Sequence, residues 1–185
     1  MTPLTPFNTV GPFFKLMLRD VAEGTATLVT GATRGDRISI EGRLLDGAGQ
    51  PILDGLIEIW QADAEGRYRH PEDPRHDGVD PAFAGYGRVS TGVAGTFTFH
   101  TIRPGLISGR AQAPHVLVSV LARGVMNRCW TRMYFEDEDL NRTDPILAMV
   151  PADRRDTLLA RKLADGRYRF DIVLQGERET VFLDA

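Results

Sequence analysis

Apolar and polar side chains alternate along several short segments of the chain. In residues 37–45, Ile38, Ile40 and Leu44 fall on one side of an extended backbone, while arginine, serine and glutamate side chains fall on the other. This two-residue period predicts a strand with one buried face. Five further segments show the same alternation or a short apolar run, and we expect strands at residues 56–61, 96–101, 115–122, 129–135 and 168–174.

Helical patterns are found in two places. Asp144 followed by Pro145 is typical of a helix start, although Pro151 leaves room for little more than one turn. Residues 153–163 carry a leucine stripe, with acidic residues early and basic residues late, and predict a second, longer helix. Short strands separated by glycine and proline turns favour an antiparallel sandwich. We therefore expect an all-β fold: an antiparallel β-sandwich core with long loops and a short helix.

The amino terminus differs from the rest of the chain. Residues 1–19 combine prolines with phenylalanines, a mixture too broken for a helix and too apolar for a solvated segment. We expect an irregular arm that docks on another surface. With 185 residues, 42% of them apolar, the chain fits a single domain over residues 1–185 that includes this arm.

Charge and cysteine content exclude several classes of function. The formal net charge of −3 provides no basic field for nucleic acid or for an anionic membrane surface. The apolar runs are far shorter than the ~20 residues that a membrane helix needs. A lone cysteine, Cys129, excludes an internal disulfide and agrees with a reducing compartment. We expect a cytoplasmic protein without nucleic-acid or membrane partners.

The long segment 62–87 is the richest in functional groups, including Tyr68, His70 and His76. A loop of this length is often functional. Its spacings match no known metal-ligand signature, so metal binding and a solvated loop both remain open. His115 begins the most apolar strand, and the position two residues on, which shares its face, is Leu117. This strand therefore supplies no His-x-His chelate, and the residues alone give no complete catalytic set.

Several segments together resemble one known family. They are Glu58-Ile-Trp-Gln-Ala-Asp-Ala-Glu-Gly-Arg-Tyr-Arg-His70, Phe97-Thr-Phe-His-Thr-Ile-Arg-Pro-Gly105, Ala113-Pro-His115 and Thr131-Arg-Met-Tyr-Phe135. In this order and spacing they resemble the intradiol ring-cleavage dioxygenases, and the resemblance extends from Thr5 to the end of the chain. It implies a β-sandwich enzyme fold and, in catalytic members, a non-haem ferric ion held by two tyrosinates and two histidines. Such ligands suit Fe(III).

The resemblance implies an incomplete iron site in this chain. Tyr68 matches the first tyrosine ligand and His115 the first histidine, but the other two ligand positions hold Ile107 and Leu117. Two neighbouring positions also depart from the catalytic pattern. Gln112 stands where catalytic chains have an arginine, and Arg132 where they have a glutamine.

Within the family, the arm Thr5-Pro-Phe-Asn-Thr-Val-Gly-Pro12, Leu121-Ala-Arg-Gly124 and Gln175-Gly-Glu-Arg-Glu-Thr-Val-Phe182 resemble alpha-type, non-catalytic chains. Such a chain pairs with an iron-bearing beta subunit in a higher-order oligomer that cleaves the ring of protocatechuate with dioxygen. The resemblance implies that Thr9, Gly11, Pro12 and Arg123 reach the partner's substrate pocket, and that Fe(III) is bound by the partner. Two alternatives stay open: a self-sufficient metalloenzyme using Tyr68, His115 and loop histidines such as His70 or His76, and a non-enzymatic binding module.

Overall fold

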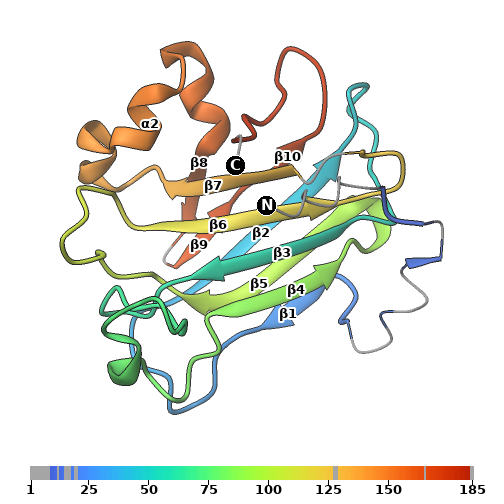
Figure 1. Cartoon of the computed structure of the whole chain (residues 1–185). Helices are drawn as coiled ribbons and strands as arrows, with labels where there is room; N and C mark the ends of the chain where they lie inside the picture. Colours follow the sequence, from blue (N-terminus) through green and yellow to red (C-terminus); the bar gives the residue numbers. More distant parts are fainter. Residues whose placement is uncertain are drawn as a thin grey trace, which may run out of the picture.

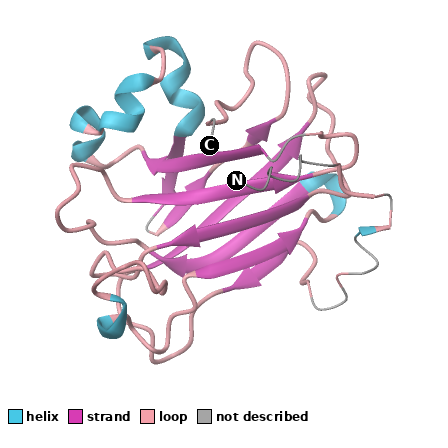
Figure 2. Ribbon diagram, viewed as in Figure 1, coloured by secondary structure: helices cyan, strands magenta, loops and turns pink. Residues whose placement is uncertain are grey.

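The computed structural model consists mainly of strands (Figure 1) and describes residues 9–11, 13–14, 18, 21–126, 129–164 and 166–183. The strands are β1 (Thr25–Thr27), β2 (Arg37–Leu45), β3 (Leu56–Gln61), β4 (Tyr86–Ser90), β5 (Thr96–Ile102), β6 (His115–Leu121), β7 (Cys129–Phe135), β8 (Leu159–Ala164), β9 (Arg167–Arg169) and β10 (Ile172–Val173). The helical segments are α2 (Pro145–Met149) and the 3₁₀ turns η1 (His76–Gly78), η2 (Val93–Gly95), η3 (Asp139–Thr143) and η4 (Ala152–Leu158). Figure 2 shows how little of the fold is helical. The expected all-β class is confirmed.

The strands form one mixed sheet that folds back on itself. Its order is β1-β5-β2-β9-β8-β7-β6-β3-β4, with β10 added to β2. Strands β3, β4, β6 and β7 form one layer and β1, β2, β5 and β9 the other, while β8 pairs with both β7 and β9 and so joins the layers (Figure 1). The expected antiparallel arrangement is not confirmed, because β1/β5, β2/β9, β10/β2 and β7/β8 are parallel pairs.

The two ends of the sheet meet at Ser90. The Ser90 carbonyl accepts a hydrogen bond from the Gly24 amide (2.9 Å), and the Ser90 amide donates to the Ala22 carbonyl (3.0 Å). This seam joins β4 to the segment that leads into β1. The sheet is therefore nearly closed.

The main core lies between the layers. Inward-pointing side chains alternate along each strand, as the two-residue period predicts. The fully buried ones include Ile40, Leu44, Ile57, Val89, Phe99, Val116, Val120, Met133 and Phe135. A second, smaller buried cluster, formed by Ala113, Tyr134, Leu147, Val150 and Leu158, lies where the helical segments meet β7. The outward face of β6 and β7 therefore has its own packing partner at one end.

One predicted helix is wrong. Residues 153–163 form η4 and then β8, whose Leu159 and Ala160 pair with Tyr134 and Phe135 of β7. Leu158, fully buried, keeps its apolar contact in the 3₁₀ turn, whereas the ladder with β7 and β9 determines the extended conformation of the rest. The short helix after Asp144 is confirmed as α2.

Other boundaries also differ. The predicted strand 168–174 is split into β9 and β10, which pair with different parts of β2. Strands β1 and β4 were not predicted, since each is short and has no regular apolar alternation. Most of the predicted arm, including Pro12, lies outside the described residues. No helix among those described is long and apolar enough to cross a membrane.

Candidate functional site

Strand register places three side chains in one row on the outward face of the sheet. Trp60 of β3 pairs with Leu117 of β6, and Leu117 pairs with Arg132 of β7. Residues two apart share a face, so His115 lies beside Leu117 in β6. The sheet thus provides the floor of a site.

Two loops provide its walls. The loop after β3 carries Tyr68, and the loop after β5 carries Ile107. Gly66 holds the two loops together: its φ is +72°, and a Cβ there would lie 2.0 Å from the Leu106 carbonyl oxygen. The Gly105 amide also donates to the Asp63 carbonyl (2.9 Å). Backbone contact this close excludes any side chain at Gly66 and fixes Tyr68 relative to Ile107.

Floor and walls enclose a pocket of about 400 Å³. Its lining includes all four positions that the family resemblance singled out: Tyr68, Ile107, His115 and Leu117. The remaining lining residues are Trp60, His70, Glu72, Asp73, Pro74, Arg75, Ser108, Gly109, Arg110 and Arg132. His76 is not among them. Four positions far apart in sequence therefore converge on one pocket.

His115 is buried and held in one tautomer. Its Nδ1 lies 2.7 Å from the Ala113 carbonyl oxygen. A carbonyl only accepts, so Nδ1 carries the proton and Nε2 holds the lone pair. Burial lowers the pKa of His115 to about 4, with a further lowering from the Arg132 charge. His115 is a neutral imidazole at neutral pH.

Tyr68 is half-buried against Trp60, with ring centroids 4.7 Å apart. Burial raises the pKa of its phenol, and the positive charges of Arg132 and Arg110 oppose this only in part. Tyr68 is therefore a neutral phenol at neutral pH.

The donor set does not fit a ferric ion. Ile107 and Leu117 offer no lone pair, and Arg132 brings a fixed positive charge into the same pocket. Within the described ranges, no group of three or more His, Cys, Asp or Glu side chains is placed to hold a metal ion. The pocket therefore has aliphatic side chains and a positive charge at the place where the resemblance implies an iron site.

Arg132 is incompletely satisfied. Its Nε and Nη1 atoms are buried and have no hydrogen-bond partner, and among the described residues no carboxylate forms an ion pair with it. The Oε1 atom of Gln112 is also buried without a partner. Native proteins leave few such groups, and each one calls for an explanation.

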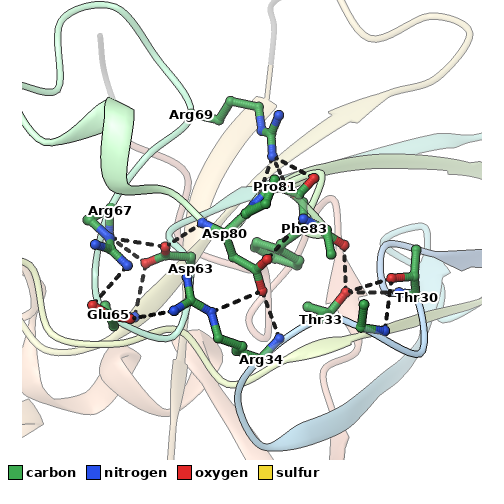
Figure 3. Close-up of polar contacts among 12 residues, drawn as sticks. Thr30, Thr33, Arg34, Asp63, Glu65, Arg67, Arg69, Asp80, Pro81 and Phe83 are labelled. Carbon is green, nitrogen blue, oxygen red and sulfur yellow. Dashed lines mark hydrogen bonds and ion pairs between the residues drawn. The ribbon is translucent and has the colours of Figure 1, made fainter.

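Two buried carboxylates of the loop 62–87, Asp63 and Asp80, hold backbone amides and arginine side chains in place (Figure 3). Asp63 accepts hydrogen bonds from the Glu65 and Arg67 amides at 2.9 Å and pairs with the Arg67 guanidinium at 3.2 Å. Asp80 accepts from the Arg34 amide at 2.7 Å. These contacts support neither of the two hypotheses left open for this loop. Asp63 and Asp80 already accept hydrogen bonds from the protein, which does not favour metal binding, and the same bonds hold the loop in place, which does not favour a freely solvated loop.

Asp144 fixes the segment that leads into β6. It is 1% exposed, and its Oδ2 accepts from the Ala113 amide at 2.8 Å. Its Oδ1 accepts from the Ile146 and Leu147 amides and from the Tyr134 hydroxyl at 2.8–3.0 Å. One buried carboxylate thereby joins the start of α2 to the backbone beside His115.

Two of the predicted docking residues, Thr9 and Arg123, lie at the other end of the sheet, and Pro12 lies outside the described residues. The Gly124 amide donates to Thr9 Oγ1 at 3.0 Å, and Arg123 forms an exposed ion pair with Asp54. Gly11 is described but exposed, and its carbonyl accepts from the Phe14 amide. The seven residues of β6 separate this end from His115 by roughly 20 Å. Thr9 and Arg123 are thus brought together, apart from the pocket.

Sequence reasoning did not assign Trp60, Arg110 or Asp144 to the site. Trp60 could have been found from pairing, since it lies in register with Leu117. Asp144 was recognised only as a helix cap, and its bond to Ala113 is a long-range contact that no local pattern signals. Arg110 lies in an irregular loop, where no sequence pattern marks it as part of a site.

Comparison with known proteins identifies the class. A family model described as Dioxygenase matches residues 9–176. The dioxygenase domain of a dioxygenase carbohydrate-binding protein fusion from Streptomyces sp. SirexAA-E is 30% identical and superposes with a TM-score of 0.62, covering 94% of this chain and 99% of that one. The chain belongs to the intradiol ring-cleaving dioxygenase family.

Two curated relatives narrow the comparison. The chain is 38% identical to the protocatechuate 3,4-dioxygenase alpha chain of Burkholderia cepacia over 98% of its own length and 97% of that protein. It is also 38% identical to the beta chain of the same organism's enzyme, over 81% of its own length and 69% of that protein. The resemblance to alpha-type chains, predicted from the arm and tail motifs, is confirmed over the whole length.

Proposed function

We propose that this chain is the non-catalytic alpha subunit of a protocatechuate 3,4-dioxygenase. The observation that carries the proposal is the identity of the four side chains that meet at the pocket of this chain: Tyr68, Ile107, His115 and Leu117. Two of them are aliphatic, and Tyr68 and His115 alone offer too few donors for a ferric ion. Full-length similarity to an alpha chain supports the same conclusion.

On this proposal the chemistry takes place in a partner. An iron-bearing beta subunit supplies Fe(III), which activates the catechol for attack by dioxygen. The complex inserts both oxygen atoms between the two hydroxylated carbons and opens protocatechuate to 3-carboxy-cis,cis-muconate, a step in the beta-ketoadipate route of aromatic catabolism. Tyr68 and His115 remain as packing residues of an ancestral site.

The second part of the proposal concerns the arm. Thr9, Gly11, Pro12 and Arg123 contribute to the substrate pocket of the partner. The hydrogen bond between Thr9 and Gly124 supports this, because it holds the described part of the arm beside Arg123. The Arg123 guanidinium is exposed and attracts a carboxylated catechol. The chain acts as a single domain, in the cytoplasm, within a higher-order alpha-beta oligomer.

The test is iron content together with the visible spectrum. Both are measured on this chain purified alone and again after co-expression with a beta chain. We expect iron and a tyrosinate-to-iron absorption band only in the co-expressed sample. Stoichiometric iron and colour in the chain alone would contradict the proposal and would favour a self-sufficient metalloenzyme.

A further inference from the structure

The pocket lined by Tyr68, Ile107, His115 and Leu117 contains an arginine that has no ion-pair partner in the described part of the chain. Arg132 lines it and has two buried nitrogen atoms without hydrogen-bond partners. Buried guanidinium nitrogens that lack hydrogen-bond partners cost free energy that a bound anion would recover. Among the described residues no carboxylate forms an ion pair with Arg132, and the buried Asp144 carboxylate accepts hydrogen bonds from the Ala113, Ile146 and Leu147 amides and the Tyr134 hydroxyl instead.

A second cation lies at the same pocket. Arg110 is exposed, and its side chain forms no hydrogen bond or ion pair within the described part of the chain. The carboxylates of the lining are already committed or solvated. Asp73 accepts from the Tyr68 amide at 2.8 Å and pairs with Arg75, and Glu72 is exposed. Arg110 is therefore accessible to an incoming anion, whereas Arg132 lines the same pocket and its two unpartnered nitrogen atoms are reached only when its side chain turns toward the ligand.

Part of the lining is aromatic or aliphatic. Trp60 packs against Tyr68 on one side and meets the His70 ring edge-on, with centroids 5.8 Å apart. Ile107 and Leu117 add aliphatic surface where the family resemblance implies iron ligands. Aromatic and aliphatic walls around one or two charged groups are typical of sites for planar ring ligands, and about 400 Å³ lies within the range of small-molecule sites.

We propose that this pocket is a binding site for a single-ring aromatic carboxylate. The carboxylate faces Arg132 and Arg110, and the ring lies against Trp60, Tyr68 and the aliphatic side chains. Replacement of two ligand positions by aliphatic residues, together with the guanidinium, has converted a metal site into an anion site. The inference rests on the proposed function in one respect only, namely that this chain holds no iron of its own.

The experiment uses 4-fluorobenzoate and the full chain, with ¹⁹F transverse relaxation as the readout. We expect saturable binding with a Kd below about 1 mM. The neutral isostere 4-fluorobenzamide and the Arg132→Gln variant should each weaken binding at least tenfold, because each removes one side of the charge pair. Arg178→Gln, a change at an exposed arginine outside this pocket, should leave the Kd unchanged.

Two outcomes would overturn the inference: a Kd above about 1 mM for the folded native chain, or a loss of affinity smaller than tenfold in Arg132→Gln. If Arg132→Gln does not fold, Arg110→Gln at the exposed rim decides, with at least a threefold loss expected and an unchanged Kd as the contrary result. Iron content is measured on the same samples. An iron-free chain that binds no benzoate removes this inference and leaves the proposed function intact, whereas an iron-loaded chain removes the proposed function.

Discussion

The buried carboxylate of Asp144 offers the sharpest test of how the pocket is held in place. In the Asp144→Asn variant, one oxygen keeps the three donors that now meet Oδ1, but the new amide group faces the Ala113 amide, 2.8 Å from the present Oδ2. Two donors then oppose each other in a fully buried position. Turning the side-chain amide over leaves more donors unpaired, so no rotamer satisfies the site.

The magnitude follows from this geometry. An unsatisfied buried donor costs about 1–3 kcal/mol, and bonds to a charged acceptor become weaker when the charge is removed. We expect Asp144→Asn to lower the free energy of unfolding by about 3 kcal/mol. Asp139→Asn is the matched control: its carboxylate is 92% exposed in a surface pair with Arg142, and we expect a change below about 0.5 kcal/mol.

Urea unfolding of the full chain, followed by tryptophan fluorescence, measures both variants. Amide hydrogen exchange provides a local readout, since the Ala113, Ile146 and Leu147 amides should lose protection before the core strands do. An Asp144→Asn chain that unfolds within 0.5 kcal/mol of the native chain would refute the reasoning. It would show that the segment before His115 is positioned by packing alone.

Three further predictions test other parts of the structure. Burial lowers the pKa of His115 to about 4 in the folded chain, whereas in the unfolded chain it lies near its ordinary 6.5. The free energy of unfolding should therefore fall between pH 7 and pH 5 by about 2 kcal/mol more in the native chain than in His115→Gln. Equal pH dependence of the two chains in urea unfolding would contradict this. Gly66→Ala should lower the free energy of unfolding by more than about 2 kcal/mol, because its Cβ would meet the Leu106 carbonyl oxygen. Gly109 also has a positive φ but open space around it, and Gly109→Ala should cost about 1 kcal/mol. Equal midpoints of the two variants in thermal unfolding would count against the contact between Gly66 and Leu106. In the complex with a beta chain, Arg123→Gln should raise the KM for protocatechuate about fivefold and leave kcat unchanged. The control Arg178→Gln should leave both constants unchanged. A loss in kcat alone would assign Arg123 a different role.

Much of the sheet could be predicted because local and global preferences agree. In β2 the buried positions Ile38, Ile40 and Leu44 are those that the two-residue period selects, and the bounds of β2, β3 and β7 match the prediction. The leucine stripe in residues 153–163 suggested a helix, and only the pairing with β7 and β9 makes its second half extended. Strand direction is equally non-local, so the parallel pairs could not be read from the pattern.

The candidate site was predictable to the extent that its residues belong to motifs. Tyr68, Ile107, His115 and Leu117 were selected by resemblance, and all four line one pocket. The electrostatic state of the pocket required the structure, because it depends on which donors find partners. Neither the neutral His115 nor the unpaired nitrogens of Arg132 can be inferred from spacing.

The seam at Ser90 limits the ways in which this chain can join another. A sheet with free edge strands can bind a partner by adding a strand, which extends the hydrogen-bond ladder across the interface. Here the amide and carbonyl of Ser90 already bond to the segment before β1. Contact at this seam must therefore be made through loops and side chains. The specificity of such an interface depends on individual side chains rather than on a shared hydrogen-bond ladder.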